Sequence, residues 1–299
     1  MPKAITLGFS YSSGKSVRMQ TLHRDSRGIF EKLIPLRSTS PVKAYYSKGL
    51  RARSVSLFCI AERSCFFLGS LFGTETTPVL LVLDINDWRR LLGPTMPYYV
   101  PSYSSWLKCI YTGDKIERSI VETFLKAFRN SPANLRHRLV SAVGTEKNAF
   151  EIGIQTLFDY LVVHEMTHCH AHTKKVNTGT FWLSEFLADY CTYAFVKDAR
   201  DTQVEKIMDI TYELIYKGGH SLVEHKSILD FEDMYSQVGF FNYEWYHAKF
   251  HRGARELYER FGTSFISAVI EEFEATDEKV VCRLDQKLKG FKKWFGAWK

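Results

Sequence analysis

The sequence predicts an α+β fold in which a small mixed or antiparallel sheet is followed by a mostly helical C-terminal part. Between residues 42 and 85 the apolar side chains form short runs rich in β-branched and aromatic residues, a pattern typical of strands. After residue 114 they recur every three or four positions, which is typical of helices. With 299 residues, 45% of them hydrophobic, the chain can bury a sizeable core.

The first region, residues 1–41, is expected to be a basic, irregular arm because it is rich in Ser, Arg and Gly. Residues 1–53 carry eleven Lys or Arg against Asp25 and Glu31, a net charge of +9, so the rest of this +7 chain nets −2. Five lysines form a second basic cluster near the C-terminus: Lys287, Lys289, Lys292, Lys293 and Lys299. Basic ends can recruit an anionic partner such as nucleic acid or a membrane surface, although scattered charges more often form a solvated face.

The second region, residues 42–145, is expected to be rich in strands. The strand candidates are residues 42–47, 54–60, 64–72, 79–85 and 106–111. A turn at residues 61–64 would join the second and third candidates as a hairpin. Three helices are predicted in the same region, at residues 86–92, 114–129 and 133–143.

The third region, residues 146–299, is expected to be helical. Helices are predicted at residues 147–170, 182–190, 195–216 and 243–262. The tail, residues 284–299, carries apolar residues on one helical face and lysines on the other; the apolar residues are Leu288, Phe291, Trp294, Phe295 and Trp298. We expect this face to dock on the helical region, the alternative being a membrane surface or a partner.

The most informative stretch is the H-E-x-x-H sequence formed by His164, Glu165 and His168. It directly follows an apolar run at residues 161–163, and Phe158 lies at helical spacing before it, so we place the motif on a helix. Residues four apart on a helix lie about 40° from each other, so both imidazoles point to one side. The two histidines can therefore share a metal ion, with Glu165 beside it.

A tetrahedral zinc site that keeps a position open for water needs a third protein ligand. The segment 182–190, W-L-S-E-F-L-A-D-Y, offers Glu185 for this purpose and carries Asp189 one turn later. Asp189 is placed to accept the free ring N–H of a ligating histidine, which fixes the orientation of that ring. The sequence thus predicts a Zn²⁺ site made by His164, His168 and Glu185.

Together these two segments resemble the gluzincin group of zinc metallopeptidases, which includes thermolysin-like and aminopeptidase-like enzymes. In that group the glutamate ligand lies on the helix after the H-E-x-x-H helix, commonly with an acidic residue one turn later. The resemblance covers about 35 central residues well. It implies a zincin-like fold, zinc bound by His164, His168 and Glu185, Glu165 as general base, Asp189 as support, and hydrolysis of a peptide or protein substrate. It also implies that an edge strand, which the sequence does not identify, pairs with the extended substrate.

Three other residues compete with Glu185 for the role of third ligand. His170 lies about 240° round the helix from His164 and so faces away. His172 lies on the same side but about 12 Å further along the axis, so it can bind only if the helix breaks after Cys169. Cys169 is a neighbour of a ligand and points away from the site.

The segment 243–262 resembles the Y-x-x-G…Y-L-x-x-x-Y-G segment of aminopeptidase-like gluzincins, in which a tyrosine three residues before the glycine stabilises the oxyanion. Phe250 occupies that position before Gly253. The resemblance therefore shifts the role to Tyr246, one turn earlier on the same face, with His247 and His251 as further candidates. Packing of Tyr246 in an aromatic core is the alternative.

Composition bears on the compartment. Six cysteines without a C-x-x-C pair, mostly in apolar surroundings, indicate buried thiols in a reducing compartment. The sequence has neither the pattern of a signal peptide nor an unbroken apolar run of roughly 20 residues, the length that spans a membrane. We therefore expect a cytoplasmic protein without a transmembrane segment, with delivery to another cell left open.

The alternative to a peptidase is a zincin-fold binding module for nucleic acid or a protein partner, with a structural or vestigial zinc site. Glu165 argues against it, because a structural site has no need of that carboxylate. Among peptidases we expect an endopeptidase, since the acidic residues that could anchor a free amino terminus, Glu146, Glu151 and Asp159, lie on an unsuitable stretch. Neither the natural substrate nor the oligomeric state follows from the sequence.

Overall fold

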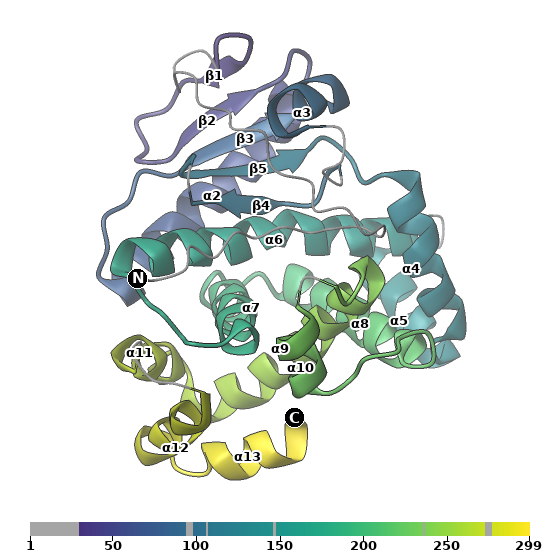
Figure 1. Cartoon of the computed structure of the whole chain (residues 1–299). Helices are drawn as coiled ribbons and strands as arrows, with labels where there is room; N and C mark the ends of the chain where they lie inside the picture. Colours follow the sequence, from purple (N-terminus) through teal and green to yellow (C-terminus); the bar gives the residue numbers. More distant parts are fainter. Residues whose placement is uncertain (1–29, 94–97, 106, 146–147, 236, 273–276) are drawn as a thin grey trace.

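The protein is a mixed α+β structure, mostly helical, with a five-stranded sheet at one end (Figure 1). This computed structural model describes residues 30–299 apart from 94–97, 106, 146–147, 236 and 273–276. Most of the arm expected at residues 1–41 therefore lies outside the described residues. The strands are β1 (Ile34–Leu36), β2 (Lys43–Tyr46), β3 (Val79–Leu83), β4 (Ser102–Ser104) and β5 (Cys109–Gly113).

The sheet is of the mixed kind, with the order β1-β2-β3-β5-β4. Its two inner pairs, β2 with β3 and β3 with β5, are parallel, and its two outer pairs are antiparallel. The strands predicted at residues 42–47 and 79–85 are confirmed as β2 and β3, and β5 overlaps the candidate at 106–111. The short strand β4 is one edge of the sheet, in a stretch where the sequence predicted no strand.

The helices account for most of the remaining chain. They are α2 (Arg51–Phe72), α3 (Ile85–Leu92), α4 (Arg118–Asn130), α5 (Ala133–Val143), α6 (Ala149–Lys174), α7 (Phe181–Asp198), α8 (Thr202–Gly219), α9 (Ile228–Met234), α10 (Phe240–Phe261), α11 (Ser264–Glu271), α12 (Asp277–Lys287) and α13 (Phe291–Trp298). The helix predicted at residues 195–216 is in fact divided, because α7 ends at Asp198 and Asp201 caps the start of α8 through the N–H of Val204.

The prediction of two strands and a hairpin at residues 54–72 is wrong, since α2 covers the whole stretch. Its buried residues recur every three or four positions, as in Leu57, Ala61, Cys65 and Leu68, which is the period of a helix. The topology requires the same result. Because β2 and β3 are parallel neighbours, the chain between them must cross over the sheet, and a helix is the usual crossover.

This correction also affects the expectation about membranes. Once the two apolar runs join into one helix, α2 is long and apolar enough to cross a membrane by length and composition. The core helix of a folded domain passes the same test. One face of α2 packs against α6, and Arg53 near its start forms an ion pair with Asp159 of α6. These contacts cover one face of α2, and 39% of its apolar window is buried.

The central element is α6, which runs beneath the sheet in Figure 1. On one side it contacts α2, β4 and β5, and on the other it contacts α7 and α8. Its middle residues, among them Val162, Val163 and Met166, are fully buried. The H-E-x-x-H motif is therefore carried by a helix that is held from both sides.

The C-terminal tail docks on the helical region, as expected. The ring of Trp298 lies 5.2 Å from that of Phe186, and the ring of Phe295 lies 4.9 Å from that of Trp182. Lys292, Lys293 and Lys299 of the same segment are exposed. The apolar face of α13 is thus covered by α7 and α10, and its lysines face solvent.

Candidate metal centre

The two histidines of the motif lie one turn apart on α6 and face the same side. Their Nε2 atoms are 3.0 Å apart. His164 is buried, whereas His168 and the adjacent Glu165 are only half-buried. The motif therefore has a closed side at His164 and a more open side at Glu165 and His168.

Helix α7 brings Glu185 to these imidazoles. Thr180 caps the start of α7 by accepting the N–H of Leu183, which fixes where the helix begins. Glu185 Oε2 then lies 3.1 Å from His164 Nε2 and 3.6 Å from His168 Nε2.

These three atoms form a triangle of the size that zinc requires. With bonds of about 2.0–2.2 Å to nitrogen and oxygen, the ligand atoms of a tetrahedral zinc ion lie about 3.3 Å apart. The observed separations of 3.0, 3.1 and 3.6 Å fit this value. The group of His164, His168 and Glu185, in which only His168 is half-buried and the other two are buried, can hold a metal ion.

Asp189 connects this triangle to α10 and accepts two imidazole N–H groups. Its Oδ1 lies 3.1 Å from His164 Nδ1, and its Oδ2 lies 2.9 Å from His247 Nδ1. The bond to Oδ1 assigns the proton of His164 to Nδ1 and leaves the Nε2 lone pair for a metal. His164, Asp189 and His247 also form a second, fully buried set of donor atoms. We interpret that set as support for the first, since the carboxylate already engages both rings.

Glu165 faces the edge of the sheet. The backbone N–H of Tyr103 in β4 donates to Glu165 Oε2 over 2.7 Å. The hydroxyl of Tyr103 lies 3.2 Å from Nδ1 of His172, two turns further along α6. Strand β4 is thus the edge strand beside the cluster, which the sequence left unidentified.

Two tyrosines that sequence reasoning missed contact the glutamate ligand. The hydroxyl of Tyr235 donates to Glu185 Oε1 over 2.7 Å, and that of Tyr243 donates to Glu185 Oε2 over 3.1 Å. Tyr243 lies four residues before His247 and therefore on the same face of α10, a spacing visible in the sequence. Tyr235 follows α9 and has no comparable signal.

The electrostatics of the cluster favour ionised carboxylates. Burial by itself would raise the pKa of Glu185, but the charge of His168 and the hydrogen bond from His164 hold that pKa well below its usual value. The same balance lowers the pKa of Asp189, where His247 and His164 outweigh burial. Burial raises the pKa of Glu165, despite the opposing charges of His164 and His168. Burial alone would lower the pKa of His164, but Asp189 and Glu185 raise it well above its usual value, so a cation that binds this imidazole displaces a proton.

Tyr246 does not reach this cluster, which corrects its assignment as the oxyanion donor. Its hydroxyl donates to the backbone carbonyl of Ser227 over 2.9 Å, and its ring packs against Phe231 at 4.8 Å. It is fully buried in an aromatic core. The alternative of core packing therefore describes Tyr246, and Tyr243 is the hydroxyl of α10 at the cluster.

The competing ligands also lie elsewhere. His170 Nδ1 lies 2.7 Å from the hydroxyl of Thr74, and burial lowers the pKa of His170 to about 4. Cys169 Sγ lies 3.6 Å from Thr76 Oγ1. His172 is exposed and contacts Tyr103. α6 continues unbroken through all three residues, so none of them joins the triangle.

The six predicted site residues thus divide into five that the fold gathers and one, Tyr246, that it does not. His247, Tyr235, Tyr243 and the N–H of Tyr103 complete the cluster.

In comparisons with known proteins, no family model, no curated protein and no solved structure matches this chain.

Proposed function

We propose that this chain is a zinc-dependent peptidase of zincin-like fold, with His164, His168 and Glu185 as metal ligands and Glu165 as general base. One observation carries the proposal. The two imidazoles and the Glu185 carboxylate have their nearest atoms 3.0–3.6 Å from one another, and a second carboxylate, that of Glu165, belongs to the same turn of α6. Zinc, when bound there, supplies a Lewis acid that polarises a carbonyl group and makes water acidic near neutral pH.

The residues around the site have separate tasks in this proposal. Glu165 takes a proton from the attacking water and passes it to the leaving nitrogen, with one carboxylate oxygen held by the N–H of Tyr103. Tyr243 replaces Tyr246 as the candidate for stabilising the oxyanion, because its hydroxyl lies 3.1 Å from Glu185 Oε2, the oxygen that lies nearest both histidines; in that role its one proton turns from Glu185 to the oxyanion. Tyr235 bonds to the other oxygen and orients the glutamate.

The substrate is proposed to be an extended peptide that pairs with β4. Among the described residues this strand pairs with β5 on one side only, and it lies against α6 next to Glu165. A peptide added at a sheet edge gains main-chain hydrogen bonds whatever its side chains. We favour internal cleavage, because Asp159, a candidate anchor for a free amino terminus, is already bonded to Arg53 at 2.7 Å.

The alternative function, a binding module with a structural metal, receives less support. A structural site is closed by four protein ligands. Among the described residues three donors converge in this group and Glu165 is not one of them; its carboxylate accepts the N–H of Tyr103 in β4.

Metal content and cleavage of an unstructured protein substrate test the proposal in wild type, Glu165→Gln and Glu185→Ala. We expect about one zinc per chain in wild type and in Glu165→Gln, with cleavage only in wild type. Glu185→Ala should lose most of its zinc. Wild type that binds no zinc, or Glu165→Gln that still cleaves, would refute the peptidase assignment.

A further inference from the structure

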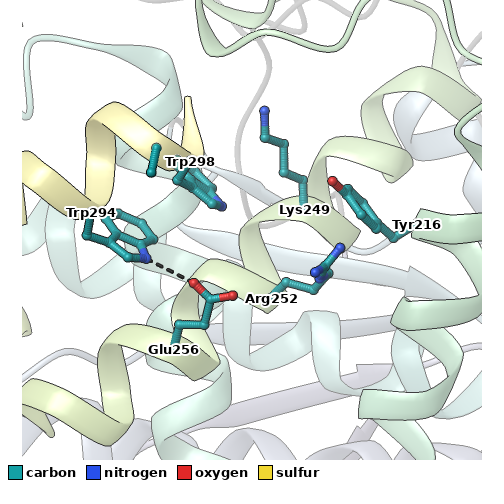
Figure 2. Close-up of a pocket in the computed structure, with 7 residues that line it drawn as sticks. Tyr216, Lys249, Arg252, Glu256, Trp294 and Trp298 are labelled. Carbon is teal, nitrogen blue, oxygen red and sulfur yellow. Dashed lines mark hydrogen bonds between the residues drawn. The ribbon is translucent and has the colours of Figure 1, made fainter.

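A second site is suggested by a cavity of about 250 Å³ between α8, α10 and α13 (Figure 2). It is lined chiefly by six residues: Tyr216, Lys249, Arg252, Glu256, Trp294 and Trp298. Residues two apart on a helix point about 200° from each other, so Lys249 lies on the face of α10 opposite His247. The cavity is therefore separate from the metal centre.

Lys249 is a buried cation without a carboxylate partner. Its side chain is only 7% exposed, and among the described residues its ammonium group makes a single hydrogen bond, to the backbone carbonyl of Lys226 at 2.8 Å. No Asp or Glu of the described part of the chain forms an ion pair with it. Burial lowers the pKa of Lys249 to about 8, so the group is still mostly charged at neutral pH. An ammonium group has three N–H donors, and the described residues supply a hydrogen-bond acceptor to one of them.

Arg252 provides a second cation in the lining of this cavity. Its guanidinium carbon lies 4.1 Å from the centre of the Tyr216 ring, and this stacking fixes the plane of the group. Its Nε forms an ion pair with Glu213 Oε2 at 3.3 Å, and among the described residues this Nε has no hydrogen-bond partner. A planar guanidinium held in this way presents a fork that matches a carboxylate.

The opposite wall is aromatic. Trp294 and Trp298 of α13 stack with their ring centres 4.9 Å apart and an angle of 18° between the planes. The indole N–H of Trp294 donates to Glu256 at 3.0 Å, so the acidic residue of the cavity is hydrogen-bonded to this aromatic side. In Figure 2, Lys249 and Trp298 face the same space, and the ammonium lies 5.5 Å from the Trp298 ring centre.

We propose that this cavity binds a small organic anion, a carboxylate carried on a flat apolar ring. Lys249 and Arg252 hold the carboxylate, and the two tryptophans of α13 line the space for the ring. A volume of 250 Å³ corresponds to roughly eight molecules of liquid water, which suits a single substituted ring. Because the residues belong to three helices distant in sequence, binding also fastens α13 to α8 and α10.

The test is isothermal titration of the full-length, zinc-loaded protein with phenylacetate. We expect saturable binding with a dissociation constant of about 1 mM or lower, and none of comparable strength for phenylacetamide, its neutral analogue. Lys249→Met should weaken phenylacetate binding at least about tenfold. Lys292→Met removes the same charge from the exposed face of α13 and should leave binding unchanged.

A carboxylate can also bind a metal centre, and the variants distinguish the two sites. Phenylacetate that binds Lys249→Met as well as wild type would show binding at the metal centre alone and would overturn the proposal, as would no binding to wild type at about 10 mM. Should Lys249→Met fail to give the circular dichroism of the folded protein, Arg252→Gln takes its place. The same tenfold loss of phenylacetate affinity is expected for Arg252→Gln, and an unchanged affinity would likewise overturn the proposal.

Discussion

At the scale of single residues, Asp189 connects the triangle of candidate ligand atoms to α10 by accepting N–H groups from two histidines. Asp189→Asn would leave one of these N–H groups without an acceptor, because the amide nitrogen cannot accept. We expect zinc affinity, measured by competition with a chelator, to fall by about 10–100-fold. Asp209 accepts from His251 at 2.7 Å away from the cluster, so Asp209→Asn is the matched control. Equal losses in both variants would mean that the effect is not specific to the site.

Lys249 illustrates how a buried charge acts on stability. Below pH 8 the lysine is charged in both the folded and the unfolded chain, so folding carries the full cost of burying the charge. Between pH 8 and the ordinary pKa of 10.5, the folded protein releases the proton first, and the cost disappears as pH rises.

Lys249→Met should therefore have a higher free energy of unfolding than wild type at pH 7, and this difference should shrink as pH rises. The pKa shift corresponds to about 3 kcal/mol, from which the lost hydrogen bond to Lys226 subtracts about 1 kcal/mol. Urea denaturation at pH 7 and pH 10 measures the difference, with exposed Lys292→Met as reference. A difference that stays constant between these pH values would contradict the account.

At the scale of the elements, α8 and α4 touch through a glycine. A methyl group added at Gly218 would lie 1.8 Å from the carbonyl oxygen of Ala127, which belongs to the backbone and cannot move aside cheaply. We expect Gly218→Ala to lower the free energy of unfolding by about 3 kcal/mol or more. Gly296 in α13 has open space around it, so Gly296→Ala should raise that free energy by about 0.5–1 kcal/mol. Urea denaturation of both variants tests the packing; comparable effects of the two substitutions would speak against it.

The elements also show what the sequence could predict and what it could not. α5 has the limits that its helical periodicity after Pro132 predicts, and Gly144, which ends it, is a second local signal. α2 was mistaken for two strands because it has few polar residues, and short apolar runs do not by themselves distinguish a buried helix from buried strands. What decided the matter was the parallel pairing of β2 with β3, which is not local.

The same distinction holds within the candidate site. His164, His168, Glu185 and Asp189 were predictable because each pair lies one turn apart on a single helix. The contacts of Tyr235 and Tyr243 with Glu185, and of Tyr103 with Glu165, depend on how α9, α10 and β4 pack against α6 and α7. Tyr246 was chosen from its place in a motif, and its neighbour three residues earlier on the helix faces the site instead.

At the scale of the whole molecule, the proposed metal would tie α6 to α7. A ligand that binds only the folded protein stabilises it by about 4 kcal/mol when its free concentration is a thousand times its dissociation constant. We therefore expect a chelator to lower the melting temperature of wild type by several degrees, and added zinc to restore it. Glu185→Ala, which lacks the ligand from α7, should melt at the same temperature with and without the chelator. A wild type that does not respond to the chelator would argue against a tightly bound metal.

The position of α6 has a consequence for which parts of this molecule can change in sequence without disturbing the candidate site. The histidines are on a helix packed on both faces, so the side chains of the proposed reaction are held by a closely packed part of the structure. The strand that would grip the substrate has three residues and is bonded to the sheet on one side only. Substitutions in β4 would therefore change which peptides bind without moving the imidazoles. In this arrangement the residues of the proposed reaction lie on a buried helix, and the residues that would select the substrate lie on a sheet edge.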